Sequence, residues 1–147
     1  MAWDYVIIGG GSAGSVLAAR LTEDPGTRVL LLEAGPRDWH PFYAIPAGFA
    51  KMTKGIGSWG WSTVPQRHMN NMRIRFTQAR VLGGGSTINA QIYTRGHPLD
   101  YDEWRQSGCT GWGYEDVLPY FRKAEDNDSF NNRWHGQGGP LGVSRPA

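Results

Sequence analysis

Two glycine-rich segments carry the residue types best suited to binding a large anionic ligand. The first is GGGSAG at residues 9–14, and the second is GGGST at residues 83–87. Because glycine has no side chain, consecutive main-chain amides in such segments can approach phosphate or ribitol oxygens, or lie flat against a ring system. We therefore expect the two segments to hold opposite ends of one extended dinucleotide.

The spacing in the first segment points to a dinucleotide more specifically. Gly9, Gly11 and Gly14 fit G-x-G-x-x-G, which provides a tight turn, room for a pyrophosphate and close packing of a helix on a strand. Glu33 follows about 20 residues later, where a carboxylate accepts hydrogen bonds from the adenosine ribose and disfavours a 2′-phosphate. FAD or NAD is therefore expected rather than NADP. The alternative is that these glycines only shape a turn and Glu33 is a solvated strand end.

The second glycine segment has a use only if the ligand extends well beyond the first. Residues 83–85 offer consecutive amides, and Asn89 adds a side-chain amide that can both donate and accept hydrogen bonds near a ring. An ordinary NAD-binding module would explain the first segment and leave the second without a role.

The elements around the first segment form a βαβ pattern. Residues 4–9 are a short apolar, β-branched run that predicts a strand buried on both faces of a parallel sheet. Residues 12–23 have the composition of a helix with one apolar face, and residues 28–35 are a second apolar run that contains the acid. Strand, glycine turn, helix and strand predict an α/β fold with a right-handed crossover.

The rest of the chain is expected to be rich in loops. Residues 36–78 contain many prolines and glycines and no sustained period, so we interpret them as an extended excursion over the cofactor. A short helix is predicted to start with Asp100 as its N-cap and to stop at Gly108. Residues 114–126 predict a second helix, kinked or delayed by Pro119, and residues 140–144 one strand.

Charge and cysteine content argue against several classes of function. The formal net charge is +2, from 15 basic and 13 acidic residues scattered along the chain, so no nucleic-acid partner is expected. Cys109 is the only cysteine and is interpreted as a small buried hydrophobe. Four histidines lack metal-ligand spacing, so no metal site is predicted, and each is assigned to a surface or loop: His40, His68, His97 and His135.

No membrane anchor or export signal is expected. No apolar run approaches the ~20 residues of a membrane span, and the start MAWDYVIIGGG lacks the basic residues and cleavage site of a signal peptide. A cytoplasmic protein without a transmembrane segment is therefore predicted.

The ordered residues around the second glycine segment resemble the first signature of the glucose-methanol-choline (GMC) family of FAD-dependent oxidoreductases. The resemblance extends to DYVIIGGGSAGSVLAARL, to EAGP after the second strand, and to GWGYEDVLPYFRKAED and HGQGGPLGV, so it covers essentially the whole chain. The signature positions are matched in order by Ala79, Arg80, Leu82, Gly83, Gly84, Gly85, Ser86, Ile88, Asn89, Tyr93 and Gly96.

This resemblance implies FAD bound noncovalently, because Ile88 stands where some members carry a histidine that bonds to the flavin. It places the first glycine segment at the pyrophosphate, Glu33 at the adenosine ribose and residues 85–92 along the isoalloxazine. Trp59 is preferred over the nearby Trp61 as an aromatic beside the cofactor. The implied cofactor-binding residues are Gly9, Gly11, Ser12, Ala13, Gly14, Glu33, Ala34, Trp59, Arg80, Gly83, Gly85, Ser86, Asn89, Ala90 and Ile92.

The activity implied is oxidation of a primary alcohol to an aldehyde by hydride transfer to flavin N5. The family's catalytic histidine lies much nearer its C-terminus, so no catalytic residue is assigned here. We expect the remainder of the same enzyme to complete an incomplete Rossmann-like FAD-binding domain and a substrate-binding α+β domain. The alternative activity is that of the family's hydroxynitrile lyases. The expected divisions are an ADP-binding unit (1–35), the excursion (36–78), a flavin-proximal segment with helices (79–130) and the start of the substrate-binding domain (131–147).

Overall fold

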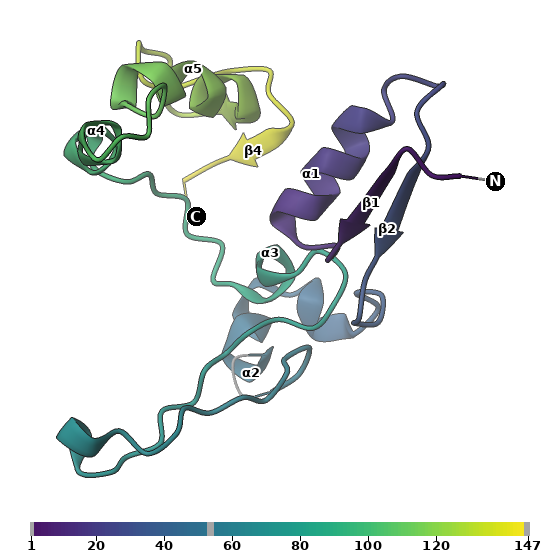
Figure 1. The fold of residues 1–147 in the computed structure, drawn as a ribbon, viewed down its shortest axis with the longest axis vertical. Coiled ribbons are helices and arrows are strands. Elements are labelled where there is room, and N and C mark those ends of the chain that lie inside the picture. Colours follow the sequence, from purple (N-terminus) through teal and green to yellow (C-terminus); the bar gives the residue numbers. More distant parts are fainter. Residues whose placement is uncertain (1, 53–54, 146–147) are drawn as a thin grey trace. The chain divides into compact units, whose positions relative to one another are not determined.

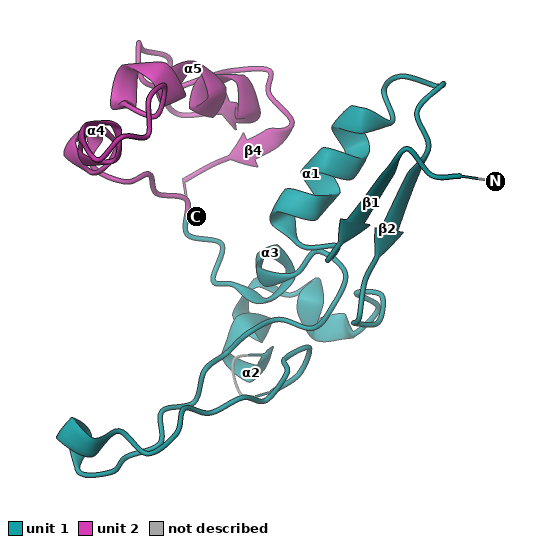
Figure 2. Ribbon diagram, in the orientation of Figure 1, with its two compact units in different colours: residues 1–92 teal, residues 93–147 magenta. Residues whose placement is uncertain are grey.

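The computed structural model describes residues 2–52 and 55–145, which fall into two compact units. Residues 1–92 form the first unit and residues 93–147 the second (Figure 2). The division falls inside the predicted flavin-proximal segment, whose functional boundaries stay a prediction.

The first unit begins with the predicted βαβ arrangement (Figure 1). Strand β1 (Tyr5–Ile8) leads through the glycine turn into helix α1 (Ser12–Leu21), and strand β2 (Val29–Leu32) follows. The two strands pair in parallel, with Tyr5 opposite Val29 and Ile8 opposite Leu32. The α/β, Rossmann-like class is confirmed, with the parallel sheet limited to two strands here.

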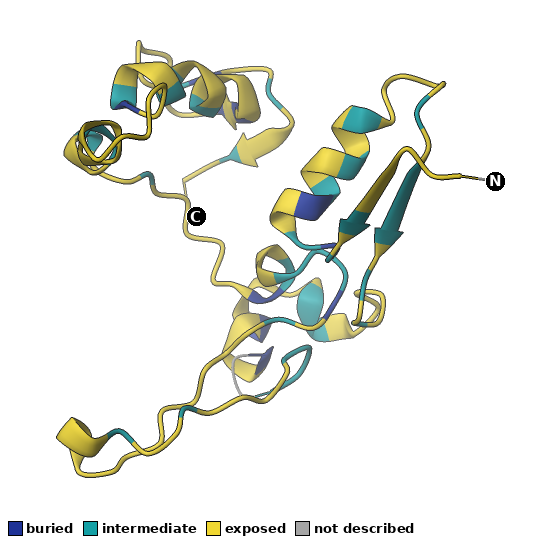
Figure 3. Cartoon of the chain, viewed as in Figure 1, coloured by how far each residue is buried: buried dark blue, intermediate teal, exposed yellow. Residues whose placement is uncertain are grey.

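The prediction that the first strand is buried on both faces is wrong for this structure. Ile8 is 86% exposed and Val6 is 55% exposed (Figure 3). A parallel sheet is covered only when elements pack on both of its faces, whereas here α1 packs against a sheet of two strands. Apolar side chains that would suit a core therefore remain at the surface.

The excursion after β2 contains short helices and an arm in which the chain runs out and then returns beside itself (Figure 1). The helices are η1 (Pro41–Tyr43), η2 (Pro46–Gly48) and α2 (Phe49–Met52). The arm spans residues 58–79, and η3 (Arg67–Met69) lies near its tip. Its two sides are joined by three isolated antiparallel bridges: Ser58 with Ala79, Ser62 with Arg75, and Gln66 with Met72.

The apolar core of the first unit lies where the excursion returns. Val81 is completely buried, and Met52 and Ile88 are nearly so, with Phe42, Tyr43, Ile56 and Ala79 packed against them. Ile88 belongs to the one-turn helix α3 (Gly85–Ile88). Val81 and Ile88 flank the second glycine segment in sequence, so the core anchors that segment at both of its ends.

The second unit contains two helices and two short strands. The helices are α4 (Pro98–Gln106) and α5 (Tyr114–Ala124), and the strands are β3 (Glu125–Asn127) and β4 (Leu141–Val143), which pair in parallel. The strand predicted at 140–144 is confirmed as β4. Its partner β3 was not predicted.

The predicted N-cap of helix α4, Asp100, is wrong by three residues. His97 is the N-cap, where its Nδ1 accepts from the Leu99 amide at 3.2 Å, and Asp100 is the third helical residue, where its carboxylate accepts from the His97 amide at 2.7 Å. Pro98 favours this start because the first helical position needs no amide proton. The predicted stop holds, since Gly108 follows the helix with φ +105°.

Pro119 does not delay the second predicted helix, but the predicted end of that helix at residue 126 is two residues too late. Helix α5 begins at Tyr114 and ends at Ala124, and Asp116 secures its start by accepting from the Gly113 amide at 3.0 Å. The loss of one interior hydrogen bond at the proline is then tolerated. Cys109 is exposed rather than buried, because it lies in the turn after α4, where its amide bonds to the Trp104 carbonyl.

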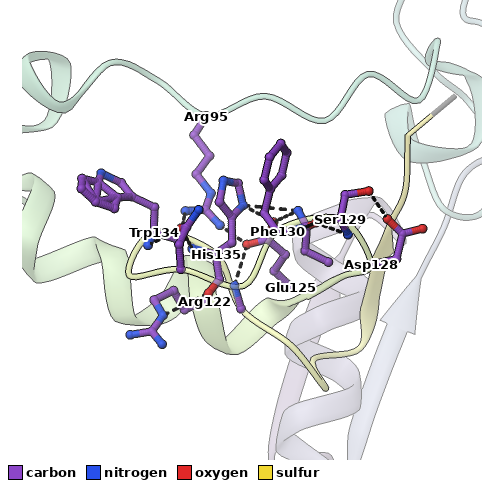
Figure 4. A network of polar contacts seen from close by, with 11 residues as sticks. Arg95, Arg122, Glu125, Asp128, Ser129, Phe130, Trp134 and His135 are labelled. Carbon is purple, nitrogen blue, oxygen red and sulfur yellow. Dashed lines mark hydrogen bonds and ion pairs between the residues drawn. The ribbon is translucent and has the colours of Figure 1, made fainter.

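A buried polar network stabilises the second unit (Figure 4). Glu125 is fully buried and accepts from the Asn127 amide at 2.8 Å and the Gly136 main-chain amide at 3.0 Å, contacts His135 Nδ1 at 2.8 Å, and pairs with Arg95. Burial raises the pKa of this carboxyl, but the hydrogen bonds and the charge of Arg95 outweigh it and lower the pKa to about 2. His135 lies in the loop between β3 and β4, in line with its assignment to a surface or loop, and its partly buried ring contacts this carboxylate.

Candidate dinucleotide-binding site

The first glycine turn requires glycine at its first and third positions. The Gly9 amide donates to the Leu32 carbonyl at 2.7 Å. At Gly9 the chain turns out of β1 with φ +99°, a conformation that residues with a side chain rarely adopt. A Cβ on Gly14 would lie 1.9 Å from the Gly9 carbonyl oxygen. The helix therefore approaches the turn closely, as the spacing predicts.

The N-terminus of α1 presents amides that suit a phosphate. Gly11 is the N-cap, and Ser12 and Ala13 are the first, exposed residues of a ten-residue helix. Amides in the first turn of a helix have no acceptor within it, and the helix dipole is positive there. The geometry is that of an anion-binding helix terminus.

The structure brings the second glycine segment directly against the first, with α3 beside the start of α1 (Figure 1). The Gly83 amide donates to the Gly10 carbonyl at 2.7 Å. A Cβ on Gly84 would lie 2.7 Å from the Gly11 Cα, so the two main chains touch. Ser12 and Ser86 contact each other through their hydroxyls. One ligand can therefore contact both segments. The prediction that they hold opposite ends of an extended dinucleotide is wrong, because two main-chain segments in direct contact meet the same part of a ligand.

Glu33 lies at the end of β2 with its carboxylate fixed by main-chain amides. One oxygen accepts from the Gly10 amide and the other from the Gly35 amide, each at 2.7 Å. A carboxylate has about four acceptor positions, so each oxygen can also accept a ribose hydroxyl. The predicted ribose-binding side chain is thus held beside the first turn.

Arg80 connects the loop after β2 to the base of the arm. Its Nε donates to the Ala34 carbonyl at 3.2 Å, and its guanidinium carbon lies 4.9 Å from the centre of the Trp59 ring. Trp59 stacks in turn on Trp61, with ring centres 5.3 Å apart. The two tryptophans form one stack, and the role of Trp59 beside the cofactor stays a prediction.

The residues predicted along the isoalloxazine follow α3 on exposed chain. The side-chain oxygen of Asn89 accepts from the Gln91 amide at 2.8 Å. Ala90 is exposed, and Ile92 is 81% exposed. They lie near the second glycine segment in sequence, and their role at a flavin stays a prediction.

Three residues outside the predicted set of cofactor-binding residues also shape the site. Gly10 bonds to both Glu33 and Gly83. A Cβ on Gly35 would lie 2.3 Å from the Val81 amide nitrogen, so the loop after β2 also approaches the second segment closely. The third is Thr87, whose hydroxyl donates to the Leu82 carbonyl at 2.8 Å. The uninterrupted run of three glycines was the available signal for Gly10.

Over residues 2–52 and 55–145, no group of three or more His, Cys, Asp or Glu side chains could hold a metal ion. None of the helices among these residues has the length and apolar character needed to cross a membrane.

A family model described as GMC oxidoreductase matches residues 3–147. The oxygen-dependent choline dehydrogenase of Xanthomonas campestris pv. campestris is 50% identical over 148 aligned positions, covering 98% of this chain and 27% of that protein. The chain therefore spans about a quarter of the length of the curated relatives it matches. These matches confirm the family predicted from the motif.

Two solved structures resemble the chain over nearly its full length. Pyridoxine 4-oxidase from Mesorbium loti superposes with a TM-score of 0.92 at 41% identity, covering 99% of this chain and 29% of that one. An FAD-dependent oxidoreductase from Chaetomium thermophilum superposes with a TM-score of 0.86 at 36% identity, covering 99% of this chain and 27% of that one. The chain thus belongs to the GMC oxidoreductase family, whose members are FAD-dependent flavoproteins, as the resemblance around the second glycine segment implies.

Proposed function

We propose that this chain is the N-terminal, FAD-binding portion of a longer enzyme that oxidises a primary alcohol to an aldehyde. The observation that carries the proposal is the hydrogen bond between the Gly83 amide and the Gly10 carbonyl, which joins two bare main-chain segments into one surface. A plain NAD-binding module would have no use for the second segment.

Each part of this surface has a chemical role in the proposal. The amides of Gly11, Ser12 and Ala13 bind the pyrophosphate, and Glu33 accepts from the adenosine ribose. The segment from Gly85 onward lies toward the flavin. FAD, when bound, supplies the acceptor for the hydride that leaves the alcohol carbon.

The rest of the enzyme supplies the group that accepts the alcohol proton. A histidine suits that step because its ordinary pKa lies close to neutrality. The exposed apolar side chains of β1 and β2 support the presence of a larger protein, because a parallel sheet is normally covered on both faces. The partner proposed for this chain is thus the remainder of the same enzyme.

The substrate is proposed to be a small molecule with a primary alcohol. The relatives are named for choline and for pyridoxine, so these two alcohols are the first to test. The longer protein that contains this chain would be purified with FAD, and each alcohol added without oxygen. Loss of the visible absorbance of oxidised flavin together with aldehyde formation is the expected result.

Two results would contradict the proposal in different ways. A purified protein that binds no FAD would remove its basis. A protein that binds FAD and cleaves a cyanohydrin while the flavin stays oxidised under every alcohol would instead show lyase activity on the same fold.

A further inference from the structure

The conformation of the second glycine segment depends on a side chain outside the glycines. Gly83 has φ +89° and Gly84 has φ +58°, so the chain makes two successive steps that residues with a Cβ rarely adopt. The segment is closed by the Gly84 amide, which bonds to the Val81 carbonyl at 2.9 Å, and by the Thr87 amide, which bonds to the Gly84 carbonyl at 3.1 Å.

The Thr87 hydroxyl spans this turn. It donates to the Leu82 carbonyl at 2.8 Å, so it ties the first turn of α3 to the residue that precedes the glycines. The same oxygen would lie 2.1 Å from a Cβ on Gly83. The hydroxyl therefore occupies the space that the missing side chain of Gly83 leaves open.

The turn that Thr87 closes is the one that contacts the first glycine segment. Gly83 donates its amide to Gly10, and Gly84 lies against Gly11. If the Leu82 carbonyl lost its donor, it would have to find another partner, and the turn would relax to allow it. A change at residue 87 is thereby transmitted to the amides on which the dinucleotide site depends.

We propose that Thr87 is a positioning residue for FAD, whose hydroxyl fixes the second glycine segment in its binding conformation. The inference rests on the proposed function, because it takes FAD as the ligand of the two segments. Thr87 acts through Leu82 and Gly83 and needs no contact of its own with the cofactor.

The test is the dissociation constant of FAD for the apo form of the longer enzyme, compared among the unchanged protein, Thr87→Val and Thr87→Ser. Valine keeps the shape and removes the donor, whereas serine keeps the donor and removes a methyl group. We expect Thr87→Val to bind FAD about tenfold more weakly and Thr87→Ser to stay within about twofold of the unchanged protein. Thr87→Ala replaces valine if that variant does not fold.

Thr22→Val is the matched control. Thr22 also donates its hydroxyl to a main-chain carbonyl, that of Ala18, at 2.8 Å, but it lies at the opposite end of α1 from the glycine turn. We expect this variant to bind FAD like the unchanged protein. The inference is overturned if Thr87→Val binds FAD within twofold of the unchanged protein, or if Thr87→Ser loses as much affinity as Thr87→Val. Failure of the unchanged protein to bind FAD would refute the proposed function instead.

Discussion

Replacing Gly84 by alanine is expected to separate the two glycine segments. Gly84 has φ +58° and ψ −135°, a conformation that costs a residue with a side chain about 1–3 kcal/mol. The new Cβ would also lie 2.7 Å from the Gly11 Cα, and a main-chain atom cannot move aside as a flexible side chain can. Together these effects predict a loss of about 2 kcal/mol or more in FAD binding, which is roughly thirtyfold in affinity.

The assay is titration of FAD into the apo form of the longer enzyme, followed by flavin fluorescence. Gly142→Ala is the control, because Gly142 lies in β4 and a Cβ there would meet nothing within 4 Å. The control should bind FAD like the unchanged protein. If Gly84→Ala also keeps its affinity within about threefold, then contact between the two segments is not needed for FAD, and the reasoning is refuted.

Three further predictions concern other parts of the chain. Glu33→Gln replaces one acceptor by a donor that faces a main-chain amide, so FAD should bind about tenfold more weakly in the same titration, and unchanged affinity would contradict the ribose role. Glu125 has its pKa lowered from 4.5 to about 2 by folding, so it stabilises the protein above pH 4.5 and this contribution disappears as the pH falls toward 2. Denaturant unfolding should therefore show the stability difference between the unchanged protein and Glu125→Gln shrinking by on the order of 3 kcal/mol from pH 6 to pH 2, whereas a constant difference would argue against the buried ion pair. Residues 1–147 expressed alone should not retain stoichiometric FAD, and tight flavin binding in the absorbance spectrum would show that no further part of the enzyme is required.

The sequence was most informative where the determinants are local. The βαβ unit was predicted because its glycine spacing and apolar runs lie within about 35 residues, and the turn at Gly9 and the close approach at Gly14 follow from that spacing. The predicted helix start at Asp100 is wrong because Asp is a good capping residue at either place, whereas Pro98 at the first helical position favours a start at His97.

Determinants that are distant in sequence were harder to predict. Strand β3 is the polar sequence EDN, and the carboxylate of its Glu125 is stabilised by Arg95, which lies 30 residues earlier. No periodicity reveals such a pair. The contact between Ser12 and Ser86, 74 residues apart, was not predicted, because the two glycine segments were expected at opposite ends of the ligand. The stack of Trp59 on Trp61 likewise depends on the arm, whose pairing the proline-rich sequence did not indicate.

A crystal structure of the longer enzyme with FAD bound would test the central claim most directly. The account predicts that the FAD pyrophosphate accepts hydrogen bonds from the start of α1 and that the same FAD molecule also contacts residues 83–86. A cofactor that contacts residues 9–14 and lies away from residues 83–86 would contradict it.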